Sequence, residues 1–110
     1  MPKDAENMST AIKIDKIVLP NGDIVPLSKG TGVTKVQTIA GKGRDRRIDE
    51  VAFLISKFGG TENEWQKKKG ICFIDIDDEQ VQVEIHWYEE QTVGVVKVKI
   101  KPQRGGEWYV

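Results

Sequence analysis

The stretch VQVEIHWYEEQTVGVVKVKIK, Val81 to Lys101, decides the fold, because it alternates apolar and polar residues over two segments that Gly94 separates. Such alternation indicates strands with one buried face, and two neighbouring segments of this kind favour an antiparallel pair. The residues expected in the core are Val81, Val83, Ile85, Trp87, Val96, Val98 and Ile100. The outer face then carries His86, which is the only histidine of the chain.

The lysines of the second segment share this outer face with His86. Registers that keep core residues opposite core residues pair His86 with Lys97 or, after a slide of two residues, with Lys99. One interpretation is the solvated side of an ordinary hairpin. The other is a catalytic cluster, because histidine changes its charge near neutral pH and a tyrosine hydroxyl can donate a hydrogen bond. The candidate catalytic residues are His86, Tyr88, Lys97 and Lys99.

A helix is expected over residues 48–58. Its apolar residues recur at the three- and four-residue spacing of one buried stripe, and they are Ile48, Val51, Ala52, Ile55 and Phe58. Asp45 is the expected N-cap, and Gly59-Gly60 is expected to end the helix. We expect this helix to cover the sheet face opposite His86.

The remaining segments complete the predicted architecture. Thr61 and Glu64 have the spacing of a capping box, which predicts a short second helix over residues 61–69. Asn21-Gly22 predicts the tight turn of an N-terminal hairpin, and the C-terminal GEWYV is a candidate last strand. The expected fold class is α+β: an N-terminal β-hairpin, with one main helix and a short second helix packed on one face of a three- to five-stranded antiparallel sheet.

Composition narrows the class of protein. The 110 residues suit one domain, expected over residues 12–110 after a flexible tail of residues 1–11. No window has the apolar length of a membrane span or the pattern of a signal peptide, so a cytoplasmic protein that does not engage membranes is expected. A single cysteine, Cys72, excludes an intramolecular disulfide, and with one histidine there is no zinc-type cluster. No cofactor or metal is expected: Asp75, Asp77 and Asp78 could hold Mg²⁺, but Asp77 and Asp78 fall at an expected turn, where solvated acidic residues are common.

The segment AGKGRDRR, residues 40–47, contains a Gly-x-Gly loop followed by basic residues. Free backbone N–H groups in such a loop attract anions, although the P-loop pattern is absent, so a plain solvated loop is the competing interpretation. The candidate phosphate- and RNA-binding residues are Lys42, Arg44, Arg46 and Arg47. Seventeen basic and seventeen acidic residues cancel over the whole chain. We nevertheless predict that this loop folds over the sheet edge that shows His86 and forms one shallow basic groove with it.

Several segments of the chain together resemble a known family. KGTGVTKVQTIAGKG, RRIDEVAFLISKFGG, WQKKKGICFIDID, EIHWYEEQTVGVVKVKIK and GGEWYV are similar to the phage Barnase/EndoU/colicin/RelE-like nuclease domain, as found at the C-terminus of MuF-type phage head morphogenesis proteins. The resemblance covers Lys16 to the C-terminus. It implies a metal-independent, RNA-cleaving toxin of phage or mobile-element origin, with an immunity protein as a partner. His86, Lys97, Lys99 and the loop with Lys42 and Arg44 are the residues that it points to.

Two functions are therefore predicted. The first is a metal-independent ribonuclease that cleaves RNA by general acid and base catalysis, with His86 as acid or base and the lysines stabilising the phosphorane. The second is a non-enzymatic protein-binding or phage structural accessory module on the same fold.

Overall fold

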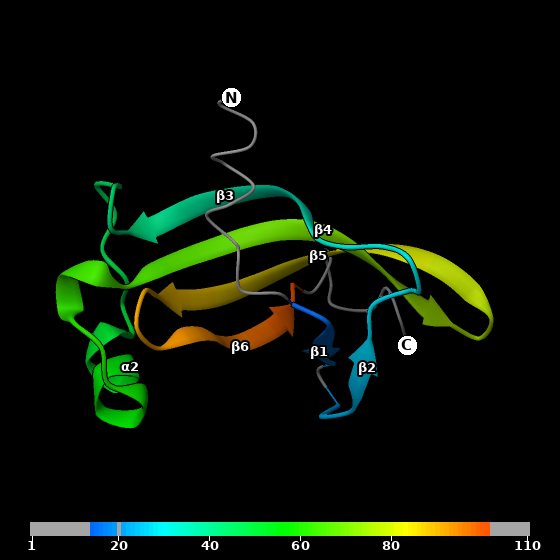
Figure 1. Ribbon diagram of the computed structural model, residues 1–110, viewed down its shortest axis with the longest axis horizontal. Helices are drawn as coiled ribbons and strands as arrows, with labels where there is room; N and C mark the ends of the chain where they lie inside the picture. Colours follow the sequence, from blue (N-terminus) through cyan, green and yellow to red (C-terminus); the bar gives the residue numbers. More distant parts are fainter. Residues whose placement is uncertain (1–13, 20, 102–110) are drawn as a thin grey trace.

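The computed structural model describes residues 14–19 and 21–101, in which six strands form one sheet (Figure 1). The spatial order of the strands is β2-β1-β6-β5-β4-β3. The elements are β1 Lys16–Val18, β2 Ile24–Pro26, β3 Thr34–Gly41, α2 Val51–Phe58, the 3-10 turn η1 Glu62–Glu64, β4 Gln66–Ile76, β5 Glu79–Glu90 and β6 Gly94–Ile100. The expected tail of residues 1–11 and the expected strand GEWYV lie outside the described residues.

The two longest strands of the sheet, β4 and β5, form a hairpin. Every residue of β4 has a partner in β5, without an interruption of the register. Asp77 and Asp78 form the connecting turn with φ of 52° and 67°, both in the left-handed region. A two-residue turn between twisted strands requires this conformation, and aspartate is among the few residues that tolerate it. Asp77 and Asp78 therefore form a turn, as the sequence predicted, while Asp75 belongs to β4.

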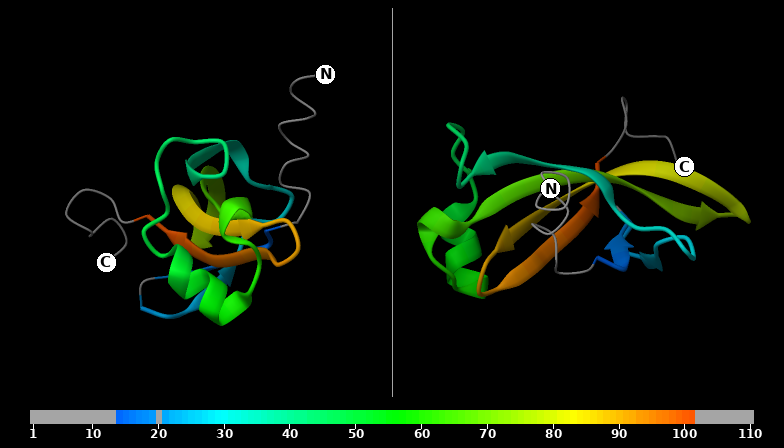
Figure 2. Two further views of the ribbon diagram at one scale, coloured as in Figure 1. Left: turned by 90° about the vertical axis from the view of Figure 1, so that its left-hand side faces the viewer. Right: turned by 45° about the horizontal axis from the view of Figure 1, so that its top comes forward.

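The two short N-terminal strands curl the sheet. β1 pairs antiparallel with β2 and parallel with β6, where Val18 faces Lys99. After β2, Leu27 forms an antiparallel bridge with Ile74, near the end of β4. Figure 2 shows β1 and β2 beneath the long strands, at an angle to them. The result is a curled sheet in which one face is enclosed.

The predicted fold class is wrong. The protein is mostly β, with a mixed, curled sheet of six strands, one helix and one 3-10 turn. The prediction of an N-terminal hairpin apart from an antiparallel sheet of three to five strands missed the parallel pairing between β1 and β6. Strands of three residues have too short a pattern for the sequence to assign them to the main sheet. The pairing of β1 with β6 depends on contacts between distant parts of the chain.

Both helical predictions also need correction. The helix begins at Val51 with Glu50 as N-cap and without a side-chain capping bond, so the predicted cap at Asp45 is wrong. The second helix, predicted over residues 61–69, is reduced to the three residues of η1. From Gln66 onward the chain belongs to β4, because pairing with β5 satisfies its backbone groups along a long apolar strand. The capping-box pattern of this segment thus gave way to long-range pairing.

Two apolar cores occupy opposite faces of the sheet. The core inside the curl contains Ile17, Cys72, Ile74, Val83, Ile85, Trp87 and Ile100. The core under α2 contains Ala40, Ile48, Val51, Leu54, Trp65 and Tyr88. Neighbours in a strand point to opposite faces, so Tyr88 shares a face with His86 and not with Trp87. Helix α2 therefore packs on the face of His86, at the end of the sheet, and the prediction that it covers the other face is wrong.

A buried ion pair lies on the enclosed face. Lys68 Nζ is 3.2 Å from Glu89 Oε2, and the Trp87 indole N–H donates to Glu89 Oε1 at 3.0 Å. Only 2% of the Lys68 side chain is exposed. The helix expected over residues 61–69 would have placed Lys67, Lys68 and Lys69 at its C-terminal end. In a strand, alternation instead turns the middle lysine inward and the two others to the face of His86.

Candidate active site

A cavity of about 220 Å³ contains all four predicted catalytic residues. Its lining comes from β4, β5, β6, the residue before α2 and the residue after β6. It consists of Glu50, Lys67, His86, Trp87, Tyr88, Lys97, Lys99, Ile100 and Lys101. We call it the His86 cavity. His86 pairs with Lys99 across β5 and β6, which is one of the two registers that the sequence left open.

A bulge in β6 brings Lys97 into the same cavity. The register shifts between His86 and Tyr88, and Lys97 adopts a left-handed φ of 57°. A bulge places two residues of one strand opposite one residue of its partner. The bulge sets Val96, instead of Lys97, opposite Tyr88, and Lys97 reaches the cavity from the bulge itself. Val96 therefore packs in the core under α2, and the expectation that it shares a face with Val98 and Ile100 is wrong. The alternating pattern of the sequence placed Lys97 and Lys99 on this face but gave no sign of the bulge.

Glu50 organises the part of the cavity next to α2. Its carboxylate accepts a hydrogen bond from the Tyr88 hydroxyl at 3.0 Å and one from Lys97 Nζ at 2.9 Å. The bond from Lys97, more than any other contact, lowers the pKa of Glu50, so this group is a carboxylate at neutral pH. Burial and the bond to Glu50 raise the pKa of Tyr88, which keeps its proton and acts only as a donor.

Glu50 is the residue that sequence reasoning missed. An acidic residue just before a helix is explained by the helix dipole alone, and nothing local marks it as a partner of strands forty residues away. Tyr88 also differs from the expectation, because it is 7% exposed and packs in the core under α2 rather than on an open surface. Only its hydroxyl group reaches the cavity.

His86 has a carboxylate partner of its own. Its Nε2–H donates to Glu84 Oε2 at 2.8 Å, and Lys101 Nζ lies 3.9 Å from the same oxygen. The bond from His86 is the largest of the interactions that lower the pKa of Glu84. This contact orients the imidazole and leaves Nδ1 as the ring nitrogen that Glu84 does not occupy. A ring held in this way can exchange a proton through Nδ1.

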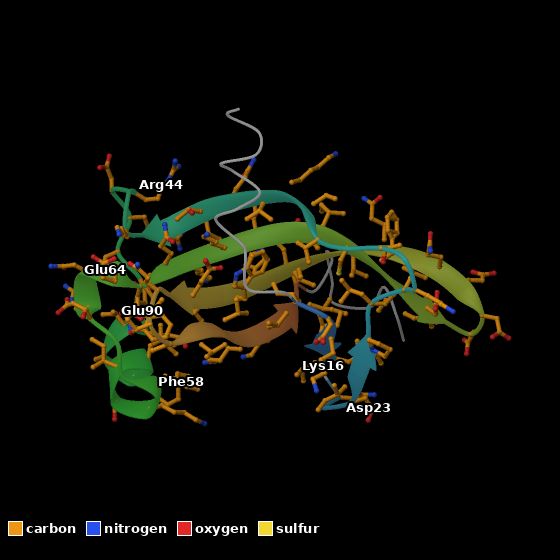
Figure 3. All side chains as sticks on the ribbon, viewed as in Figure 1. Lys16, Asp23, Arg44, Phe58, Glu64 and Glu90 are labelled. Carbon is orange, nitrogen blue, oxygen red and sulfur yellow. The ribbon has the colours of Figure 1, made fainter. Side chains whose placement is uncertain are left out.

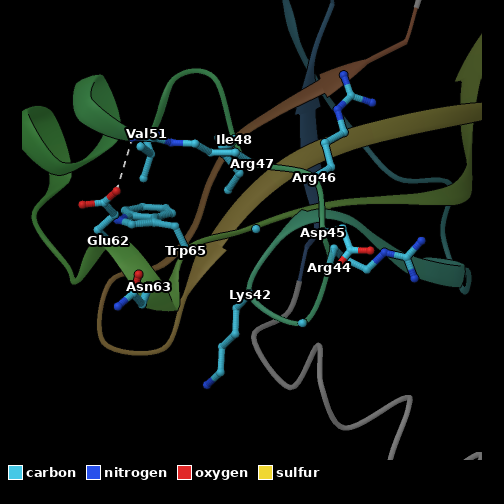
Figure 4. Close-up of a pocket in the computed structure, with 12 residues that line it drawn as sticks. Lys42, Arg44, Asp45, Arg46, Arg47, Ile48, Val51, Glu62, Asn63 and Trp65 are labelled. Carbon is cyan, nitrogen blue, oxygen red and sulfur yellow. Dashed lines mark hydrogen bonds and ion pairs between the residues drawn. The ribbon is translucent and has the colours of Figure 1, made fainter.

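The predicted phosphate-binding residues line a different cavity. Lys42, Arg44, Arg46 and Arg47 surround a hollow of about 480 Å³ between the loop after β3 and η1 (Figure 4). Among the described residues, none lines both this loop cavity and the His86 cavity. The predicted single basic groove is therefore not formed.

The cations of the loop cavity do not converge on one point. Lys42 pairs with Glu64 at 2.6 Å and Arg47 with Glu62 at 3.4 Å, so η1 supplies a carboxylate to each. Figure 4 shows the side chains of Lys42, Arg44 and Arg46 directed away from one another. A phosphate cradle needs donors that point at a common centre. This arrangement favours the solvated-loop interpretation.

The structure also places the cysteine and the first aspartate that the sequence analysis considered. Cys72 is buried, as expected, and burial raises the pKa of its thiol to about 11, so it is not a thiolate near neutral pH. Asp75 accepts a hydrogen bond from the Ser28 hydroxyl at 2.8 Å. Within residues 14–19 and 21–101, no group of three or more His, Cys, Asp or Glu side chains could hold a metal ion. Neither helical segment described is long and apolar enough to cross a bilayer.

Comparison with known proteins gives no relative for this chain: no family model, no curated protein and no solved structure matches it. The resemblance to phage nuclease domains therefore stays a prediction from the sequence.

Proposed function

We propose that this protein is a metal-independent ribonuclease whose active site is the His86 cavity. The observation that supports the proposal is the convergence of His86, Tyr88, Lys97 and Lys99 on one hollow, together with a carboxylate from another part of the fold. Metal-free RNA cleavage requires a base, an acid and cations close together. The cavity contains one side chain or more of each kind.

The roles follow from the chemistry of the side chains. Glu50 is a carboxylate and can accept the proton of the 2′-OH, whose oxygen then attacks the neighbouring phosphorus. The bond from phosphorus to the 5′-oxygen breaks, and His86 donates a proton to that oxygen. The products are a 2′,3′-cyclic phosphate and a 5′-hydroxyl. Lys97 and Lys99 stabilise the charge on the phosphorane, where one well-placed donor contributes about 2.7–4 kcal/mol. The Tyr88 hydroxyl holds Glu50 in place through its hydrogen bond.

The proposal extends to the biological setting. A free ribonuclease damages its own cell, so a toxin of phage or mobile-element origin that acts in the cytoplasm requires an immunity protein. The basic surface around His86 is complementary to an acidic partner as well as to RNA.

A second candidate is the non-enzymatic binding module. The separation of the loop cavity from the His86 cavity favours it, because the basic loop cannot hold RNA while a proton moves at His86. In this case the lysine-rich face would bind a protein partner without chemistry.

Incubation of purified protein with RNA in the presence of EDTA separates the two. For a ribonuclease, we expect cleavage that EDTA does not prevent and that His86→Ala reduces about 10²- to 10⁴-fold. Lys29→Gln, at an exposed position outside both cavities, is the matched surface control and should keep full activity. Intact RNA with the folded wild-type protein would reject the ribonuclease and leave the binding module.

A further inference from the structure

The strand register places a continuous row of residues across the outer face of the sheet. Direct partners in a sheet point to the same face, so each pairing carries the row one strand further. The pairs are Ile24 with Val18, Val18 with Lys99, Lys99 with His86, His86 with Lys69, and Lys69 with Gln37. We call these six residues the transverse row. It runs at right angles to the strands and passes through His86.

A second cavity lies on this row, on the far side of His86 from Lys99. It has a volume of about 160 Å³ and is lined by Lys35, Gln37, Lys69, Gly70, Ile71 and Glu84. Glu84 connects the two hollows, because it lines this one and accepts the hydrogen bond from His86. The β3 edge cavity, as we call it, therefore begins where the His86 cavity ends.

The charge of this face differs from that of the whole chain. The His86 cavity is lined by four lysines and one carboxylate, and the β3 edge cavity by two lysines and one carboxylate, while the chain as a whole carries no net charge. Adjacent strands lie about 4.8 Å apart, so the step from Lys99 to Gln37 covers about 14 Å. An excess of cations over this length suits a polyanion better than a single phosphate.

The two ends of the row differ in chemistry. Beyond Lys99 it continues as Val18 and Ile24, which are apolar and 39% and 64% exposed. On the other side it continues through Lys69 to Gln37, whose amide can both donate to and accept from a base edge. The cationic part of the row therefore extends from the His86 cavity toward β3, and not toward β2.

We infer that a single RNA strand crosses the sheet along the transverse row, with the scissile phosphate in the His86 cavity and a neighbouring nucleotide in the β3 edge cavity. This inference rests on the proposed function. Lys69 and Lys35 contact the phosphate next to the reacting one, Ile71 contacts the base, and Gln37 is positioned to select it. Single-stranded binding of this kind combines a positively charged track with apolar contacts to bases.

Binding of uncleavable probes tests the path. The probes are a dinucleotide and a hexanucleotide of 2′-O-methyl RNA, whose blocked 2′-oxygen cannot attack phosphorus. We expect the wild-type protein to bind the hexanucleotide more tightly than the dinucleotide. Lys69→Gln and Lys35→Gln should each weaken hexanucleotide binding roughly two- to fivefold and leave dinucleotide binding unchanged. Each should also reduce the salt dependence, since one phosphate contact contributes about 0.7 to the slope for single strands.

Lys29→Gln removes one positive charge from an exposed loop position outside both cavities and should bind both probes like the wild type. Thermal unfolding of each variant shows whether it is folded. Equal binding of the two probes by the wild type, or equal behaviour of Lys69→Gln, Lys35→Gln and Lys29→Gln, overturns the path.

The outcomes separate this inference from the proposed function. If RNA stays intact but hexanucleotide binding depends on Lys69 and Lys35, the path holds and the ribonuclease fails. If His86→Ala abolishes cleavage while Lys69→Gln and Lys35→Gln bind like Lys29→Gln, the ribonuclease holds and the path fails.

Discussion

The His86 cavity and the loop cavity are both rich in basic side chains, but they are built in different ways. The His86 cavity lies on three paired strands, where the register and one bulge set the positions of Lys67, Lys97 and Lys99. The loop cavity lies between an irregular loop and η1, at the end of the sheet next to α2, where Figure 3 shows Arg44 and Glu64. The loop cavity is the larger of the two.

The difference teaches that basic residues alone do not define a site. In the loop cavity, carboxylates of η1 pair with Lys42 and Arg47, and these ion pairs hold the loop against the turn. In the His86 cavity, Glu50 accepts from two donors at once and so pulls Lys97 and Tyr88 toward one point. Convergence of donors, rather than their number, is what chemistry requires.

The same substitution in each cavity gives the largest expected contrast. Glu50→Gln removes the proposed base and should lower RNA cleavage about 10²- to 10⁴-fold. Glu62→Gln changes the loop cavity in the same chemical way and should leave cleavage unchanged, because its partner Arg47 does not line the His86 cavity. Single-turnover cleavage rates measure both. Equal losses in the two variants would contradict the separation of the cavities.

The backbone of the loop cavity should be sensitive to alanine substitution at one of its glycines. Gly41 has a φ of +89°, and an added Cβ would lie 2.3 Å from the Trp65 carbonyl oxygen. Gly43 has nearly the same φ of +85°, with no atom within 4 Å of an added Cβ. Both alanine variants incur the left-handed cost of about 1–2 kcal/mol, and Gly41→Ala should lose about 1–3 kcal/mol more through overlap.

Urea unfolding of the two glycine variants checks this difference. Gly43→Ala serves as the control for backbone conformation, so the difference between the variants isolates the contact with Trp65. Similar unfolding free energies in both would mean that the loop moves away without cost.

The unfolding free energy in acid tests the contribution of Glu90, which accepts a hydrogen bond from the residue before η1. Glu90 is 2% exposed and accepts from the Thr92 hydroxyl at 2.7 Å, from the Thr61 N–H at 2.9 Å and from the N–H groups of Thr92 and Val93. The bond from the Thr92 side chain is the largest of the effects that lower the pKa of Glu90 to about 2, from an ordinary value of 4.5. A lowered pKa means that the folded state favours the carboxylate.

The sign of the pH effect follows. The contribution of Glu90 is present above pH 4.5 and is lost as the pH falls toward 2, because protonation then favours the unfolded chain. Glu90→Gln should therefore remove part of the fall in unfolding free energy over this window. Glu79→Gln, at an exposed position in β5, is the control and should keep the wild-type slope. Identical slopes in all three proteins would rule out the role of Glu90.

The smallest effect is expected for the ion pair of Lys42 and Glu64. Their side chains are 51% and 35% exposed, so water screens the attraction. A double-mutant cycle with Lys42→Gln and Glu64→Gln should give a coupling below about 1 kcal/mol that decreases in salt. A larger coupling that salt does not affect would show that the loop cavity is more rigid than its exposure implies.

Local patterns identified part of the fold and most of the candidate cluster. The alternation in β5 predicted Val83, Ile85 and Trp87 as core. The residue types in β6 left Lys97 and Lys99 as alternative partners of His86, and the structure pairs His86 with Lys99. These predictions succeed because side-chain direction in a strand follows from the backbone and not from the rest of the molecule. Tyr88 shows the limit of this rule, since the pattern gave its face and not the helix that covers it.

The sequence by itself determined which residues of β5 share a face, where the turn of Asp77 and Asp78 lies and that Cys72 is buried. Only the tertiary structure decided that residues 66–69 extend β4, that β1 docks parallel on β6, and that Glu50 meets Tyr88 and Lys97. The physical reason is the range of the interactions. Alternation and turn conformation act over a few residues, whereas strand docking and the Glu50 contacts join groups that are distant in the chain and meet only when the sheet curls and α2 packs on it.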